Sequence, residues 1–255
     1  MFETAIYAKP WIVAVGVNTV LLAIAFLLPK KLLTPMGYLN AWLLGVLLWG
    51  AVGWQAFAVV MAYFALGSAV TKVGFAEKTA AGIAEARGGV RGPGNVWGSA
   101  LVAALCALLI LGLKLSGQSD SWVGWLTLGL VASIATKLSD TSATEIGKAY
   151  GQRTFLITTL KPVPRGTEGA VSLEGTVAGV VGSIALAAFA AVIGLIAPMG
   201  IVICAIAAFV ATTIESLIGA TLEDRVPGLT HDVVNIINTL IGAAVAVGLA
   251  GLLGY

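Results

Sequence analysis

Residues 38–71 read YLNAWLLGVLLWGAVGWQAFAVVMAYFALGSAVT, a run of 34 positions without a charged side chain. A helix that spans a bilayer needs about 20 apolar residues, so the run is too long for one ordinary helix and slightly short for two straight ones. Its centre, residues 49–54 (WGAVGW), has two glycines and two aromatic residues of the kind found at membrane interfaces. The run therefore predicts two short spans, 38–51 and 53–70, joined by a tight hairpin at the membrane surface.

The composition of the whole chain indicates a membrane protein with many spans. Hydrophobic residues make up 59% of the 255 residues and charged residues only 10%, against about 25% in soluble domains. The 32 glycines suit helices that pack closely in lipid. We expect an all-α fold, a polytopic membrane helix bundle of about seven or eight transmembrane helices, with residues 1–255 forming a single domain. The further spans are expected at about 11–28, 97–115, 122–138, 175–196, 199–220 and 233–253.

The basic residues favour the choice of eight spans. The loops after the first, third, fifth and seventh spans then share one face and hold all but two of the 14 basic residues, leaving Lys9 and Lys114 on the other face. A single span over 38–71 would place Lys30 and Lys31 opposite the next basic loop. Because basic loops stay in the cytoplasm, we expect both termini on the non-cytoplasmic side and the active site on the cytoplasmic face.

The charged residues gather in residues 137–176 (KLSDTSATEIGKAYGQRTFLITTLKPVPRGTEGAVSLEGT), which hold five basic and four acidic side chains. Charge near a membrane is costly unless it is paired or used, so the segment predicts a ligand site. Residues 139–151 are expected to continue the preceding helix, with room on one face for a phosphate-bearing ligand. That face is formed by Asp140, Thr144, Gly147 and Gly151. Glu145 points elsewhere and need not share a ligand with Asp140.

An earlier polar loop, residues 71–95 (TKVGFAEKTAAGIAEARGGVRGPGN), ends in a glycine-rich turn beside Arg87 and Arg91. Glycine permits positive φ there, and successive backbone N–H groups in such a turn can bind an anion. The alternative is a basic loop that holds lipid headgroups at the membrane surface. Both interpretations place anionic groups at this turn.

Residues 161–169 (KPVPRGTEG) cannot be helical through two prolines. They predict an extended loop that brings together Lys161, Arg165 and Thr167. Ser172 and Thr176 follow at the start of the next span, where backbone donors suit an anion. Because carboxylates beside such donors would repel phosphate, Glu168 and Glu174 are candidate Mg²⁺ ligands or partners of the basic side chains.

Glu215 lies inside the apolar end of the seventh span, and a lone carboxylate at that depth is a functional candidate. Asp232, Asn235 and Asn238 recur every three positions and are candidates to face the same polar cavity. His231, the only histidine, lies at an expected helix start, where we expect a capping or surface role. Cys106 and Cys204 lie in apolar runs and are expected to be core or lipid-facing thiols.

These residue types suit phosphoryl or nucleotidyl transfer. The chain has no Walker P-loop, Rossmann fingerprint, nucleophilic triad or Cys/His metal cluster. Its carboxylates suit Mg²⁺, and its Lys, Arg and backbone N–H groups suit phosphates. The acceptor is expected to be a lipid. The competing class is an ion or solute transporter, since intramembrane carboxylates also mark transport pathways, but here the charges gather in long loops on one face.

Four motifs give the chain a resemblance to a known family. They are KxGxxxK with GIAExRGGxRGxxN at 72–95, SDTxxxEIGKxxG at 139–151, PxGTxGxxSLxGT at 164–176 and ESxxGATLE at 215–223. Together they resemble the plant and cyanobacterial phytyl-phosphate kinase family of integral membrane proteins, which is more distantly similar to dolichol kinases, phytol kinases and phosphatidate cytidylyltransferases. Two positions depart from the family pattern: Trp97 stands where we expect Asn, and Glu215 where we expect Asp.

The resemblance implies phosphorylation of an isoprenoid monophosphate, such as phytyl phosphate, to the diphosphate in tocopherol and phylloquinone synthesis. The implied cofactor is Mg²⁺, and the implied partners are a nucleoside triphosphate (CTP first), the prenyl monophosphate and membrane lipids, with no nucleic acid and the oligomeric state open. The alternatives are a prenol or lipid kinase and a cytidylyltransferase that forms a CDP-lipid. A bacterial or cyanobacterial inner membrane, or a thylakoid-type membrane, is the expected location.

The residue types and the motifs together lead us to expect particular site residues. The expected catalytic residues are Asp140, Glu145, Lys72, Arg87 and Arg91. The expected nucleotide and phosphate ligands are Lys78, Gly88, Gly89, Asn95, Lys148, Lys161, Arg165, Gly166, Thr167, Ser172 and Thr176. The expected metal ligands are Asp140 and one or more of Glu145, Glu168, Glu174 and Glu215.

Overall fold

The computed structural model describes residues 2–29, 31–117, 120–222 and 225–255, which are almost entirely helical apart from one short hairpin. The elements in chain order are α1 (Phe2–Leu27), α2 (Pro35–Ala51), α3 (Trp54–Lys72), α4 (Phe75–Ala80), the 3₁₀ turn η1 (Ala86–Gly89), α5 (Pro93–Ser116), α6 (Asp120–Tyr150), β1 (Thr154–Leu156), β2 (Ala170–Ser172), α7 (Leu173–Val192), α8 (Met199–Thr221) and α9 (His231–Leu253). The predicted all-α polytopic bundle is confirmed. Seven of the described helices are long and apolar enough to cross a membrane, and α2 is slightly shorter with 17 residues.

The chain breaks the long uncharged run where the sequence predicts a hairpin. Gly53 lies between α2 and α3 with φ 139°, a conformation that glycine adopts readily and other residues rarely. Trp49 packs against Phe57 with ring centroids 5.3 Å apart. A Cβ on Gly50 would lie 2.3 Å from the indole of Trp11 in α1. The absence of a side chain at Gly50 therefore lets α1 pack closely against α2. The prediction of two short helices in place of one long span is confirmed.

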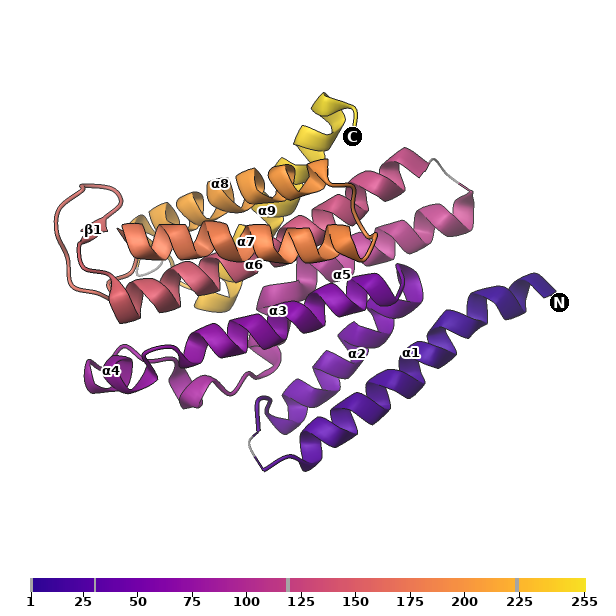
Figure 1. Cartoon of the computed structure of the whole chain (residues 1–255), viewed down its shortest axis with the longest axis horizontal. Coiled ribbons are helices and arrows are strands. Elements are labelled where there is room, and N and C mark those ends of the chain that lie inside the picture. Colours follow the sequence, from indigo (N-terminus) through magenta and orange to yellow (C-terminus); the bar gives the residue numbers. More distant parts are fainter. Residues whose placement is uncertain (1, 30, 118–119, 223–224) are drawn as a thin grey trace.

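The two ends of the bundle differ in character. Figure 1 shows both termini toward one end, with α4 and the β1–β2 hairpin at the opposite end. Lys114 donates to the carbonyl oxygen of Ala51 at 3.1 Å, which places it beside the C-terminal end of α2 and away from the basic loops. This arrangement agrees with an even number of long helices. The cytoplasmic location of the loop end stays a prediction.

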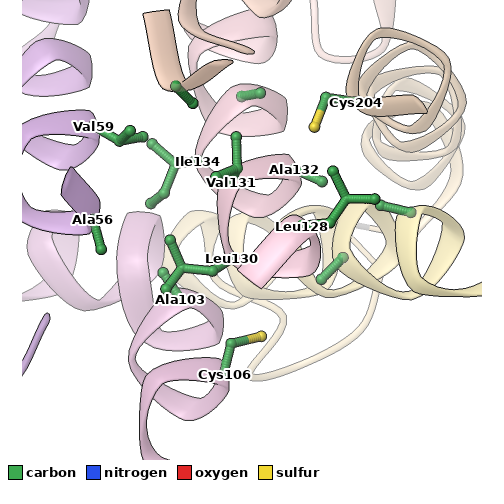
Figure 2. Close-up of a cluster of buried hydrophobic side chains, with 14 of the residues drawn as sticks. Ala56, Val59, Ala103, Cys106, Leu128, Leu130, Val131, Ala132, Ile134 and Cys204 are labelled. Carbon is green, nitrogen blue, oxygen red and sulfur yellow. The ribbon is translucent and has the colours of Figure 1, made fainter. Parts of the chain in front are cut away.

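The hydrophobic core forms around α6, which lies between α3, α5, α7, α8 and α9. Leu128, Leu130, Val131 and Ile134 of α6 are completely buried. Figure 2 shows them surrounded by smaller side chains from the neighbouring helices. Those neighbours include Ala56 and Val59 of α3, Ala103 and Cys106 of α5, and Cys204 of α8. Both cysteines are free and buried, as expected for core thiols.

Helices α6 and α7 cross with their backbones almost in contact. A Cβ on Gly175 would lie 2.6 Å from the carbonyl oxygen of Ala143, and one on Gly179 would lie 3.0 Å from that of Ser139. Distances this short leave no room for a side chain on either glycine. The crossing therefore fixes the start of α7 against the polar end of α6.

Replacing Gly175 with alanine should destabilise the protein by about 1–3 kcal/mol, because the added methyl overpacks this crossing. The midpoint of thermal unfolding in detergent measures the effect. Gly248→Ala in α9 is the matched control, since nothing lies within 4 Å of a Cβ there and alanine is the better helix former. Equal midpoints for the two variants would contradict the close crossing.

Candidate active site

A polar cavity of about 70 Å³ lies at the loop end of the bundle, between α3, α5, α6 and α9. Residues of the first two motifs line it together, although the motifs are far apart in the sequence. From the first motif come Glu85, Gly89, Arg91 and Asn95, and from the second come Asp140, Thr141, Thr144 and Glu145. The structure therefore brings the predicted catalytic residues Asp140, Glu145 and Arg91 to one cavity.

An ion pair within α6 lies beside this cavity. The Lys137 ammonium is 2.5 Å from Oδ2 of Asp140 and also donates to Oδ1 of Asn235 on α9 at 2.5 Å. The carboxyl group of Glu215 on α8 lies close to Asp140, and Glu215 accepts from the Asn238 amide. These contacts join α6, α8 and α9 through polar groups at the end of an otherwise apolar bundle.

A second ion pair joins α4 to α6. Lys78 is 1% exposed and Glu145 is 3% exposed, and the Lys78 ammonium contacts the Glu145 carboxylate. Lys78 also donates to the carbonyl oxygen of Thr71 at 2.9 Å. Two side chains that we expected to bind phosphate and metal are therefore engaged with each other, in a contact that fixes the loop after α3 on the central helix.

Removing one member of this buried pair should leave the other charge without a partner. We expect Lys78→Met to destabilise the protein by about 3–5 kcal/mol. The double variant Lys78→Met/Glu145→Leu should recover most of that loss, because an apolar pair of similar size replaces a buried ion pair at little cost. Unfolding in a dodecyl sulfate titration gives the comparison. A double variant no more stable than Lys78→Met would contradict the importance of the pairing.

A larger groove of about 330 Å³ adjoins the polar cavity and shares Thr144 and His231 with it. It lies between α6, α7, α8 and the hairpin that β1 and β2 form. Hydroxyl groups are common along it, from Ser139, Thr144, Thr154, Thr167, Ser172, Thr176, Thr212, Thr213 and Ser216. Gly147, Gly166, Gly175 and Gly179 bring backbone to its surface, and Lys148 and Glu168 add charge. The groove runs along the face of α6 that carries Thr144 and Gly147. The sequence predicts room for a ligand on this face.

Other predicted site residues lie outside both cavities in the described part of the chain. These are Lys72, Lys78, Gly88, Lys161, Arg165, Glu174 and Glu215. Arg165 donates to the carbonyl oxygen of Ala149 at 2.9 Å, and Glu174 accepts from the Gln152 backbone N–H at 3.4 Å. The first contact holds the loop between β1 and β2 against the end of α6, and the second joins the first turn of α7 to the segment that follows α6. The side chain of Arg87 lies outside the described part of the structure.

Asp232, Asn235 and Asn238, the three residues expected to face one polar cavity, lie in different surroundings. Asn235 lines the cavity, but Asp232 lies against the first turn of α5, where a Cβ on Gly94 would be 2.1 Å from its Oδ2. A carboxylate is favourable beside a helix N-terminus. The expectation that Asp232 faces the same cavity as Asn235 is therefore wrong. Residues three positions apart on a helix still differ in direction by about 60°, and here Asp232 lies against α5.

Sequence reasoning missed the positions of Lys137 and His231. Thr230, not His231, caps α9 by accepting from the Val233 N–H, so of the expected capping or surface role for His231 the structure agrees with the surface role. His231 is exposed and lies at the junction of the cavity and the groove. Lys137 was counted as one of many basic residues, although its i, i+3 spacing from Asp140 on a helix was a usable signal.

The carboxylates can be tested for their fit to Mg²⁺. Within the described ranges, no group of three or more His, Cys, Asp and Glu residues is placed to hold a metal ion. Mg²⁺ needs fewer protein ligands, since it is usually bound through one or two carboxylates and substrate phosphates. Asp140 and Glu215 are neighbouring carboxylates, and two such groups tolerate proximity when a proton or cation lies between them. Asp140 and Glu145 each have a lysine partner, but Asp140 also has the Glu215 carboxyl group beside it, so Asp140 and Glu215 fit this ion better than Glu145.

The fold and the polar end of the bundle define a multi-pass integral membrane protein. The chain belongs to the family described as Integral membrane protein DUF92, whose family model matches residues 18–243. It is 60% identical over 242 residues to the uncharacterized membrane protein sll0875 of Synechocystis sp., covering 95% of this chain and 92% of that protein. It is 44% identical over 239 residues to protein VTE6, chloroplastic, of Arabidopsis thaliana, covering 93% and 71%.

A more distant relative is the uncharacterized membrane protein MJ0933 of Methanocaldococcus jannaschii, which is 31% identical over 235 residues, covering 91% of this chain and 92% of that protein. No solved structure matches the chain. These matches confirm the family resemblance that the four motifs indicate.

Proposed function

We propose that the protein is a membrane kinase that transfers a phosphoryl group from a nucleoside triphosphate to an isoprenoid monophosphate, giving the diphosphate. The observation that carries this proposal is the meeting of the first two motifs at one polar cavity, with a hydroxyl-lined groove from the third motif beside it. The family resemblance of the four motifs supports the same reaction. CTP is the first candidate for the donor and phytyl phosphate for the acceptor.

The reaction makes modest chemical demands on the protein. An oxygen of the lipid phosphate forms a bond to the γ-phosphorus, the bond from that phosphorus to the bridging oxygen breaks, and the nucleoside diphosphate leaves. The attacking oxygen is already anionic, so no strong general base is needed, and catalysis depends on positioning and on neutralising charge. Arg91 and Lys137 supply positive charge at the polar cavity.

The groove suits the nucleotide phosphates. Ser172 caps α7 by accepting from the Gly175 N–H, and the free backbone donors of a helix start attract phosphate. Gly147 of α6 and Gly175 of α7 line the groove without a side chain, while Lys148 offers a cation. The nucleotide would thus lie on the α7 side of the polar cavity.

Mg²⁺ is the proposed cofactor, and it would neutralise the nucleotide phosphates as the reaction proceeds. Asp140 and Glu215 are the residues that would hold it. Lys137 fixes the orientation of Asp140 through their ion pair, and Asn238 does the same for Glu215. Because basic loops face the cytoplasm, we place the site on the cytoplasmic face of a bacterial inner membrane or a thylakoid-type membrane.

Purified protein incubated with phytyl or geranylgeranyl monophosphate, Mg²⁺ and either CTP or ATP should yield the prenyl diphosphate, which mass spectrometry identifies. Asp140→Asn keeps the shape of the side chain and removes its charge, so turnover should fall by about two orders of magnitude or more. Glu77→Gln, an exposed position on α4 outside both cavities, should leave turnover unchanged.

The product mass separates this proposal from its alternatives. A CDP-lipid would identify a cytidylyltransferase, and phosphorylation of the free alcohol alone would identify a prenol kinase. Full activity in Asp140→Asn would show that the metal assignment is wrong. Solute flux in liposomes without nucleotide turnover would favour a transporter.

A further inference from the structure

A third cavity, of about 140 Å³ and almost entirely apolar, lies between α1, α2, α3 and α5. Leu21 and Leu22 of α1, Leu44 of α2, and Phe57 and Val60 of α3 are among the residues that line it. Its lining follows α1 from Asn18 to Leu28, which corresponds to about 15 Å along the helix axis. The cavity is thus long, narrow and hydrocarbon-like.

The apolar cavity meets the polar cavity at one border. Tyr63, Arg91, Asn95 and Ser99 line both of them. The Tyr63 hydroxyl and the Ser99 hydroxyl are 3.0 Å apart, and Arg91 Nη1 donates to the Tyr63 hydroxyl at 3.0 Å. A molecule with a polar head and an apolar tail would have both ends accommodated at this border.

Arg91 is held firmly at the border by its backbone. Its N–H donates to the Leu32 carbonyl oxygen and its own carbonyl accepts from the Thr34 N–H, both at 3.0 Å. Its guanidinium lies over the rings of Tyr63 and Phe64, at 5.4 Å and 5.7 Å from the ring centroids. The position of this cation is therefore set by the protein before any ligand binds.

The guanidinium has no carboxylate partner among the residues that the structure describes, where the ion pairs are Lys78–Glu145 and Lys137–Asp140. A half-buried cation beside an apolar cavity is costly unless an anion pairs with it. The planar fork of arginine matches the oxygens of a phosphate group and binds it through two hydrogen bonds. Charge complementarity at the border thus favours a phosphate head in contact with Arg91.

We propose that the apolar cavity binds the hydrocarbon chain of the lipid monophosphate, whose phosphate contacts Arg91 and faces Asp140. The chain runs along α1, away from the loop end. This inference rests on the proposed kinase function and adds the location and direction of the lipid substrate. The lipid and the nucleotide then reach the polar cavity from opposite sides, because the groove adjoins it at Thr144 and His231.

Photolabelling of the purified full-length protein without nucleotide tests the site. The probe is geranylgeranyl monophosphate that carries a diazirine at the far end of its chain. We expect labelled peptides from α1 and α3, and competition by unmodified geranylgeranyl monophosphate. Arg91→Gln should lower labelling by the phosphate probe about tenfold or more, the loss of a charge-assisted hydrogen bond, while labelling by the matching alcohol probe stays the same.

Labelling on α7 and α8, or an equal loss for both probes in Arg91→Gln, would overturn the inference. The failure of this site and the failure of the kinase proposal give different results. Labelling of α1 without diphosphate formation from any donor would leave the lipid site standing and remove the proposed reaction. Diphosphate formation with labelling only on other helices would do the reverse.

A pair of tryptophan variants on α1 provides a second test. Leu22 lines the cavity, whereas Ile24 does not and is 55% exposed. Leu22→Trp should fill the distal part of the cavity and lower labelling by the twenty-carbon probe about tenfold, with little effect on a five-carbon prenyl monophosphate probe. Ile24→Trp should change neither. Equal effects of the two tryptophans on the long probe would contradict the assignment.

Discussion

The energetic cost of charge in an apolar bundle is the constraint on which the rest of this structure depends. Lys137 and Asp140 lie at the end of the buried core of α6, on either side of Leu138, and each neutralises the other there. Asn235 and Asn238 of α9, with Glu215 of α8, complete the polar contacts of the pair. Three helices are thereby held in one arrangement at the loop end, because any slip would leave a charge in lipid without a partner.

Small residues make that arrangement possible. Gly175 and Gly179 let α7 lie against the backbone of α6, so the start of α7 and the polar end of α6 form two walls of the same groove. The buried Lys78–Glu145 pair draws the loop after α3 onto α6 beside the polar cavity. The central helix therefore carries both the core and the candidate site, and the other elements are positioned by contact with it.

Much of this fold could be predicted from the sequence. Within the described ranges, the eight long helices follow the apolar runs closely, and the glycines at 50 and 53 indicated the break between α2 and α3. The pairing of Lys78 with Glu145 could not be predicted, since helical periodicity gives the face of a side chain and not the neighbour across 67 positions. The same limit applies to Asp232. Its spacing from Asn235 predicted a shared face, but the spacing could not show that α5 lies against its side chain. The apolar cavity, the polar cavity and the groove depend on such neighbours, so the sequence indicated polar residues of the last two without their division into separate sites.

The length of α6 sets the level at which the proposed reaction takes place. Its 31 residues extend about 46 Å, well beyond the roughly 30 Å of hydrocarbon in a bilayer, and a tilt within the usual range of about 0–40° still leaves the polar end in the headgroup layer. A lipid whose phosphate already lies in that layer can react without leaving the membrane plane. Its supply would then depend on its mole fraction in the bilayer, so dilution by other lipids would slow the reaction even at constant bulk concentration.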